Sequence, residues 1–287
     1  MKKMNIEQIV KLLGKLKGSR GTWESHWQEV TDFVLPRKNT VLNKKSPGEK
    51  RTWQLLDNTA VHSNELLAGA LHSMLTNPDS PWFEMTTGNI ITDNDDQVRL
   101  WLQETTRDIH NVINNSNFQT EVHELYVDLG AIGTACQLIE EDDDTIVRFS
   151  TKFIADYFIK ESRSGKVELI MHEARWKAHD LIEEFSEKGM HRDVLKEYTE
   201  QKGTEYKVVH CVYECAEKYY SVYILPDLNH KLKEETFNEF PYLTPRWSKA
   251  SGEDYGRSPG MSCLPEIKVL NKMNETLTVF MISEIER

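Results

Sequence analysis

Residues whose types could support chemistry are spread widely along this 287-residue chain. Pro226-Asp227 and the later Glu266-Ile267-Lys268 have the residue types of a metal-dependent nuclease site of the Pro-Asp…Glu-x-Lys kind. That chemistry requires carboxylates and a lysine on neighbouring strands, gathered around a metal ion. Glu266 and Lys268 fall instead at the start of an expected helix. Chance is therefore the better explanation of two such short motifs.

Two further clusters contain metal-ligating residue types. Residues 140–144 are a run of carboxylates, but carboxylates on a hairpin tip repel one another into water, whereas a metal needs ligands that converge from several elements. Cys211 and Cys215 share one face of an expected strand, and the adjacent His210 would point to the opposite face. A zinc site would need two more ligands at suitable spacing. Buried free thiols are expected, with no metal and no cofactor.

Nucleophilic and nucleotide-binding motifs are also missing from the sequence. No serine lies in a Gly-x-Ser-x-Gly elbow, and the ten histidines have no spacing that pairs them as ligands. Gly252 and Gly256 are followed by Arg257-Ser258 and not by the Gly-Lys-Ser/Thr of a phosphate-binding loop. The sequence therefore predicts no catalytic residues, and the protein is not expected to be an enzyme.

The composition is that of a globular protein, with 39% hydrophobic and 28% charged residues. No apolar run is long enough to span a membrane, and the basic N-terminus is followed by no apolar signal region, so a cytoplasmic product is expected. The net charge is −11, with 46 acidic against 35 basic residues. This balance argues against tight static binding to a phosphate backbone. It is compatible with a passage through which nucleic acid slides without sticking.

The elements that position these residues change along the chain. The first third is expected to be helical, with apolar spacing that predicts helices at 4–17, from the glycines at 18–21 to Pro36, at 58–76, at 94–114 and from 118 to about 129. The third of these is apolar on most sides, which predicts burial. Tryptophans 23, 27 and 101 lie on apolar helix faces, where core packing is favoured over stacking on single-stranded nucleic acid. The polar and basic residues 37–52 are expected to form a loop.

The middle of the chain is expected to form strands, which favours an α+β fold. Hairpins are predicted from 134–140 with 145–150 and from 153–160 with 167–175, followed by a helix at 177–188 and strands at 205–215 and 218–225. From Met261 onward a helical stripe returns, formed by Leu264, Ile267, Leu270, Leu277 and Phe280 among others. At 1.5 Å per residue this segment makes a rod of roughly 40 Å. No capping glycine or proline follows it, so the helix is expected to continue further.

The loop before this helix is the most informative stretch of the sequence. Gly252, Gly256 and Gly260 permit backbone shapes that a Cβ forbids, and Pro259 suits the first turn of a helix. Pro245-Arg246-Trp247, followed by Gly252-Glu253-x-Tyr255-Gly256-Arg257-Ser258-Pro259, resembles the head-to-tail connector (portal) proteins of short-tailed bacteriophages.

Further stretches resemble the same family in the same order. They are the tryptophan-bearing segment from Arg20 to Pro36, Leu67 to Leu71, Pro81-Trp82-Phe83, Leu100-Trp101-Leu102, Ser116-Asn117-Phe118, Leu129 to Ala135, and Pro265-Glu266-Ile267-Lys268-x-Leu270-Asn271. Because the matches cover nearly the whole chain, their combined signal is strong although each motif is modest.

The resemblance implies a ring of identical subunits, usually twelve, at one vertex of the capsid. Residues 1–133 would be the helical part of a wing, 134–247 its β-rich part, and 248–287 a loop and a first stem helix of an incomplete portal-type fold. Implied partners are other copies of the chain, major capsid and scaffolding proteins, a terminase, a tail adaptor and double-stranded DNA bound non-specifically, with no membrane. The protein would be made in the host bacterial cytoplasm and reside in the virion. Arg257, Lys268, Lys272 and Glu275 are the residues expected near DNA or a neighbouring subunit.

One departure from the family pattern is large. Family members continue into a clip, a returning stem helix, a channel loop and a crown, and this sequence stops before them. The alternatives from other classes are a metal-dependent nuclease or similar packaging-associated enzyme, and a DNA-binding module whose affinity for duplex would fall steeply with salt.

Overall fold

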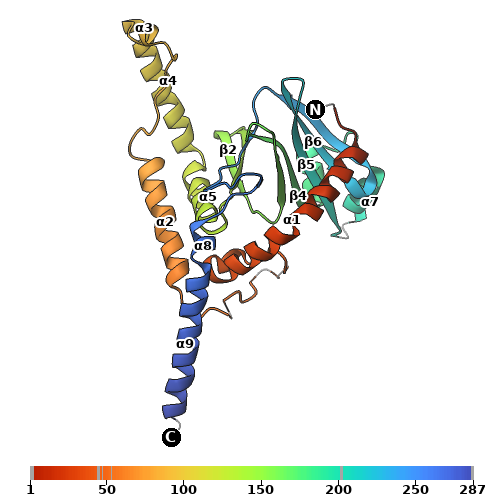
Figure 1. The fold of residues 1–287 in the computed structure, drawn as a ribbon. Coiled ribbons are helices and arrows are strands. Elements are labelled where there is room, and N and C mark those ends of the chain that lie inside the picture. Colours follow the sequence, from red (N-terminus) through yellow and green to blue (C-terminus); the bar gives the residue numbers. More distant parts are fainter. Residues whose placement is uncertain (1–2, 44–45, 47, 53, 201–202, 286–287) are drawn as a thin grey trace. The chain divides into compact units, whose positions relative to one another are not determined.

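The computed structural model describes residues 3–43, 46, 48–52, 54–200 and 203–285 (Figure 1). Contacts divide the chain into two compact units. Unit 1 comprises Met1–Trp27, Phe153–Tyr242 and Ser251–Tyr255, and unit 2 comprises Gln28–Lys152, Leu243–Ala250 and Gly256–Arg287. Helices and antiparallel sheets occur together, which confirms the α+β class. The wing and stem boundaries expected at 133/134 and 247/248 concern roles in an assembly and stay a prediction.

Unit 1 is built on a five-stranded antiparallel sheet with the order β3-β4-β5-β6-β7. Its strands are β3 (Tyr157–Glu161), β4 (Val167–Lys177), β5 (Glu205–Cys215), β6 (Lys218–Leu225) and β7 (His230–Phe237). One face packs against the start of helix α1 (Ile6–Val34), where Ile9 and Leu13 join a core that contains both Cys211 and Cys215. This shared core confirms that the two thiols lie on one face, and burial raises the pKa of Cys211.

The opposite face of this sheet is covered by helices α6 (Ala178–Phe185) and α7 (Arg192–Glu200). Leu181 and Val194 from these helices pack with Val208 of β5 and with Leu225 at the end of β6. A 3-10 turn, Pro226–Leu228, connects β6 to β7. The strand β7 was not predicted, because its charged residues Lys231, Lys233, Glu234 and Glu235 mark an exposed edge and give little hydrophobic signal.

Unit 2 is mainly helical. It contains a 3-10 turn (Pro36–Lys38), α2 (Thr59–Leu75), α3 (Ile90–Asp93), α4 (Asp96–Asn115), α5 (Phe118–Ile132), α8 (Pro259–Ser262) and α9 (Leu264–Ile285). The most buried of these is α5, which contributes Val122, Leu125, Tyr126 and Val127 to the core. The hairpin of β1 (Cys136–Asp142) and β2 (Ile146–Lys152) is as predicted, including its acidic tip, and short β8 (Tyr242–Leu243) completes a three-stranded sheet.

The N-terminal segment corrects one expectation. Helices at 4–17 and from 18–21 to Pro36 were predicted as separate, but α1 is a single helix from Ile6 to Val34. Gly18 and Gly21 have open space around them and ordinary helical backbones. A glycine inside a helix costs about 1 kcal/mol, which lowers helix stability without ending the helix. Only Pro36 stops it.

The expected burial of α2 and of Trp101 is also wrong. Leu66 and Met74 of α2 are 61% and 81% exposed, and only Asn64 and Ala68 of this helix are buried. Trp101 on α4 is 60% exposed, whereas Trp27 is fully buried as predicted. An apolar helix face indicates that something covers it, and in these two helices nothing within the described chain does so. No helix in the described residues is both long and apolar enough to cross a membrane.

Candidate functional site

The second half of the 248–260 loop is locked in unit 2 by two glycines. Gly133 ends α5 with a left-handed backbone (φ +86°), and its carbonyl accepts a hydrogen bond from the Trp247 amide at 2.9 Å. The Gly256 amide donates to Thr134 Oγ1 at 2.7 Å. A Cβ on Gly256 would lie 2.3 Å from the Gly133 carbonyl oxygen, and one on Gly133 would lie 2.6 Å from the Arg257 backbone. The two backbones approach so closely that only glycine fits at either position.

Ser258 then starts the helical segment. Its buried hydroxyl accepts a hydrogen bond from the Met261 amide at 2.9 Å and donates one to the Ala131 carbonyl at 2.6 Å. It therefore caps α8 at its N-terminus and also satisfies a carbonyl in the last turn of α5. Pro259 occupies the first helical position, as its fixed φ predicts.

Residues 251–255 of the loop belong to unit 1. Tyr255 packs its ring against Trp23 and Trp27, with centroids 5.8 and 4.9 Å away. Its hydroxyl accepts from the Ile159 amide at 3.4 Å. Asp254 accepts from the Glu161 amide through Oδ1 at 3.2 Å. Burial raises the pKa of Tyr255.

Polar side chains attach the start of α9 to the rest of unit 2. Asn271 accepts from the Leu56 amide at 2.7 Å and donates to the Gln54 carbonyl at 3.1 Å. Asn274 donates to the Asp57 carboxylate at 2.8 Å. Because these amides hold the 54–57 segment, α9 has a fixed position within its own unit.

The residues expected near DNA or a neighbour lie as follows. Lys268 forms an ion pair with Glu29. Lys272 and Glu275, one turn apart on α9, pair with each other at 2.7 Å; Lys272 is exposed and Glu275 is partly exposed. Arg257 lies in the loop, is exposed, and bridges through its amide to the Ser248 carbonyl at 2.7 Å. The role of these four charges near DNA or a neighbour stays a prediction.

The apolar stripe of α9 is largely uncovered in the single chain. The exposed side chains are Val269, Leu270, Met273, Leu277, Val279, Phe280, Met281 and Ile282. A contiguous exposed apolar surface of this kind marks an interaction site in a folded protein. The periodicity of the sequence predicted part of this surface, including Leu270, Leu277 and Phe280. The predicted Leu264 is buried instead, and the exposed Val269, Val279 and Ile282 lie outside the predicted stripe.

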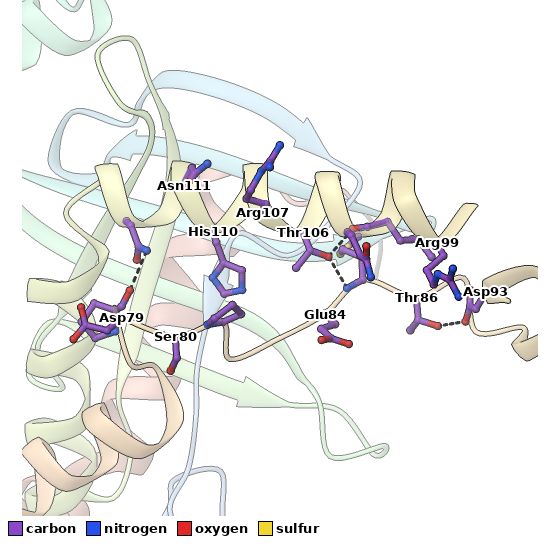
Figure 2. Close-up of a pocket in the computed structure, with 16 residues that line it drawn as sticks. Asp79, Ser80, Glu84, Thr86, Asp93, Arg99, Thr106, Arg107, His110 and Asn111 are labelled. Carbon is purple, nitrogen blue, oxygen red and sulfur yellow. Dashed lines mark hydrogen bonds between the residues drawn. The ribbon is translucent and has the colours of Figure 1, made fainter. Parts of the chain in front are cut away.

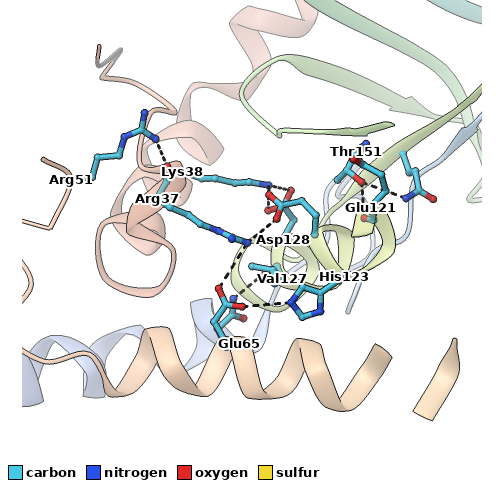
Figure 3. A network of polar contacts seen from close by, with 12 residues as sticks. Arg37, Lys38, Arg51, Glu65, Glu121, His123, Val127, Asp128 and Thr151 are labelled. Carbon is cyan, nitrogen blue, oxygen red and sulfur yellow. Dashed lines mark hydrogen bonds and ion pairs between the residues drawn. The ribbon is translucent and has the colours of Figure 1, made fainter. Parts of the chain in front are cut away.

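A charged network joins the basic segment to α5 (Figure 3). Lys38 contacts both carboxylate oxygens of the buried Asp128, at 2.6 and 2.7 Å, and also Glu124 at 2.5 Å. Arg37 contacts Glu124 at 2.8 Å and Glu65 of α2 at 3.9 Å. Burial raises the pKa of Asp128 to about 6 although Lys38 opposes that rise. Arg37 and Lys38 therefore act inside unit 2, while Lys44 and Lys45 of the same basic run lie outside the described residues.

A groove of about 680 Å³ follows one face of α4 (Figure 2). The irregular segment of residues 78–86 forms its other wall. Two hydrogen bonds attach this segment to α4: His110 Nε2 contacts the Phe83 carbonyl at 3.2 Å, and the Thr106 hydroxyl accepts from the Met85 amide at 3.0 Å. Charges of both signs line it: Asp79, Glu84, Asp93, Arg99 and Arg107. No sequence motif marks this groove, because its walls come from two segments that only the fold brings together.

The chemical alternatives receive no support. Glu266 and Lys268 lie on a helix, not on the paired strands that the nuclease chemistry requires. Within the described residues, no group of three His, Cys, Asp or Glu side chains is placed to hold a metal ion.

Unit 2 thus combines a glycine-locked loop end, a capped turn and a long helix whose apolar side chains are largely exposed. The chain belongs to the bacteriophage head to tail connecting protein family, whose model matches residues 7–281. It is 30% identical to the portal protein of Salmonella phage epsilon15, over 92% of this chain and 50% of that protein. It is 29% identical to the probable portal protein of Bordetella phage BPP-1, over 90% of this chain and 49% of that protein. The chain thus spans about half the length of the curated relatives it matches.

Proposed function

We propose that this chain is a portal subunit, which forms a ring at one capsid vertex, provides the channel for DNA during packaging and ejection, and attaches the tail. The observation that carries the proposal is the family match across residues 7–281, together with relatives named portal proteins. The chain spans about half the length of those relatives, so the role of a whole portal protein is a proposal for this chain.

The apolar stripe of α9 supports this role. A ring requires heterologous contacts that close on themselves, and exposed Leu277 and Phe280 need a neighbouring surface to cover them. In this proposal α9 is the first stem helix, residues 1–133 and 134–247 form the two parts of the wing, and 248–287 form the loop and stem.

The charges fit a channel that DNA passes without being captured. The net charge of −11 repels phosphate from the wall. Arg257, Lys268, Lys272 and Glu275 are proposed to lie near DNA or the adjacent subunit. Local pairing of Lys268 with Glu29 and of Lys272 with Glu275 would moderate their attraction for phosphate.

The proposed partners follow from the same role. They are further copies of the chain in a ring of about twelve, major capsid and scaffolding proteins, a terminase, a tail adaptor and non-specifically bound double-stranded DNA. The protein would act in the virion, at the portal vertex, without catalysing a reaction.

Electron microscopy of the purified chain without DNA tests the proposal. Rings with a central hole are expected. Monomers at all concentrations would contradict ring formation by these residues alone. Cleavage of DNA by the purified chain, lost on Asp227→Asn or Glu266→Gln substitution, would overturn the non-enzymatic role.

A further inference from the structure

Strand β3 is at one edge of the five-stranded sheet of unit 1. Its partner β4 lies on one side only, so every second residue of β3 directs its backbone groups away from the sheet. The outward backbone groups belong to Tyr157, Ile159 and Glu161, because each of these residues has a backbone hydrogen bond to a side chain outside the sheet. An edge with open N–H and C=O groups is a template for pairing with another chain.

Three side chains occupy these outward groups. Arg20 Nη1 donates to the Tyr157 carbonyl at 2.5 Å, the Tyr255 hydroxyl accepts from the Ile159 amide at 3.4 Å, and Asp254 Oδ1 accepts from the Glu161 amide at 3.2 Å. The edge is thus covered by side chains from α1 and the 251–255 loop and not by another strand.

Arg20 is firmly held in this position. It is 3% exposed and also donates to the carbonyls of Ile154 and Ala155, at 2.9 and 3.1 Å. Glu24 balances its charge at 2.7 Å. Its guanidinium lies 3.9 Å from the centre of the Phe158 ring. A buried arginine with all these partners is costly to displace.

The other edge of the sheet shows by contrast why β3 needs a cover. Strand β7 carries Lys231, Lys233, Glu234 and Glu235, and such charges discourage pairing by themselves. The stretch Tyr157-Phe158-Ile159 has no charge and is buried. Without its cover, β3 would present an edge whose first three residues are apolar with strong strand propensity, followed by the oppositely charged Lys160 and Glu161.

The best-fitting occupant of an open β3 edge is β3 of a second copy. In an antiparallel pair centred on Ile159, Tyr157 faces Glu161 of the second copy, and Phe158 faces its Lys160. No like charges meet in this register, and the contact is self-complementary about a two-fold axis.

We infer that Arg20, Asp254 and Tyr255 close the β3 edge against strand pairing with a second copy of this chain. The Asp254-Tyr255 part of the loop motif then has a role separate from that of the glycines and Ser258. It keeps copies that are held close together from joining through their sheets.

The double variant Asp254→Ala/Tyr255→Phe tests this inference. It removes both acceptors but keeps an aromatic ring against Trp23 and Trp27. Ser251→Ala, in the same loop and exposed, is the control. Residue-resolved hydrogen exchange at low concentration should show the Ile159 and Glu161 amides exchanging about tenfold faster in the double variant alone, with β4 and β5 unchanged.

At higher concentration, sedimentation should show the double variant forming a new dimer in which these two amides become protected again. Unchanged exchange at Ile159 and Glu161 would overturn the cover. Faster exchange without a new dimer would show that the cover does not prevent pairing with a second copy. If the double variant does not fold, Tyr255→Phe alone gives the same test through the Ile159 amide.

Discussion

The carbonyl oxygen of Gly133 lies 2.3 Å from the position that a Cβ on Gly256 would occupy. One glycine ends α5 and the other begins the return of the loop toward α8, so the contact fixes two backbones of unit 2 against each other. Their separation in the sequence exceeds 120 residues, as the Gly256 amide to Thr134 hydrogen bond also shows.

Gly256→Ala should therefore destabilise the protein by about 1–3 kcal/mol or more, because the nearest atoms are backbone and cannot move aside. The measurement is urea unfolding followed by circular dichroism. Gly69→Ala on α2, where nothing lies within 4 Å, is the control and should be neutral or stabilising. Equal stability of the two variants would contradict the close backbone contact.

Ser258→Ala should cost about 1–3 kcal/mol, because it removes the cap of α8 and leaves the Ala131 carbonyl unpaired. Ser262→Ala is the matched control, since its hydroxyl is exposed and bonds only to the Ser258 carbonyl. Thermal unfolding of both variants decides the matter. A Ser258 variant as stable as the Ser262 variant would show that the hydroxyl has no capping role.

Asp128 should make stability depend on pH. Burial raises the pKa of Asp128 to about 6 from 3.8, so the folded state binds this proton more tightly than the unfolded state does. The favourable contribution is complete below pH 3.8 and is lost as the pH rises through about 6. At 1.36 kcal/mol per pKa unit the loss amounts to about 3 kcal/mol at most.

Denaturant unfolding at several pH values between 4 and 7 would measure this effect. The difference in unfolding free energy between wild type and Asp128→Asn should change across that range. Asp108 is exposed on α4, and Asp108→Asn is the control. Its unfolding free energy should follow that of the wild type across the same pH range. Parallel profiles for wild type and Asp128→Asn would refute the raised pKa.

Replacing Gly18 or Gly21 by alanine should stabilise α1 by about 0.5–1 kcal/mol each, because the helix is continuous there and the space is open. Gly252→Ala gives the contrast: its surroundings are also open, but its φ of +83° makes any Cβ strained. The midpoint temperature of thermal unfolding should rise for the Gly18 and Gly21 variants and fall for the Gly252 variant. Loss of stability at Gly18 would favour two separate helices.

Polar substitution of the α9 stripe should separate folding from assembly. Leu277→Ser with Phe280→Ser should leave the unfolding free energy of the monomer within about 0.5 kcal/mol, because both side chains are exposed. Sedimentation and electron microscopy should show fewer or no rings. Thr276→Ser, on the same helix, should assemble as wild type does. Normal rings from the double variant would exclude this stripe as a subunit contact.

Periodicity and turn chemistry in the sequence were sufficient for most local elements. The hairpin of β1 and β2, the strands β5 and β6 and the helices α4 and α5 are as predicted, because each depends largely on contacts between near neighbours in the chain. The apolar stripe of α9 was predicted in part. The loop motif also indicated the family, since its residue types are unusual in combination.

Tertiary structure alone decided what covers each surface and which distant groups meet. Hydrophobic spacing predicted that α2 and Trp101 would be buried, yet burial depends on whether another segment reaches them. Other contacts join residues that are far apart in the sequence. Examples are the contact of Gly133 with Gly256, the cover of β3 by Arg20, Asp254 and Tyr255, and the pairing of Lys38 with Asp128. The sequence by itself determined the elements and the family, because local backbone preferences and motifs are written along the chain. Long-range contacts are set only when the chain folds, because they depend on the three-dimensional packing of all its parts.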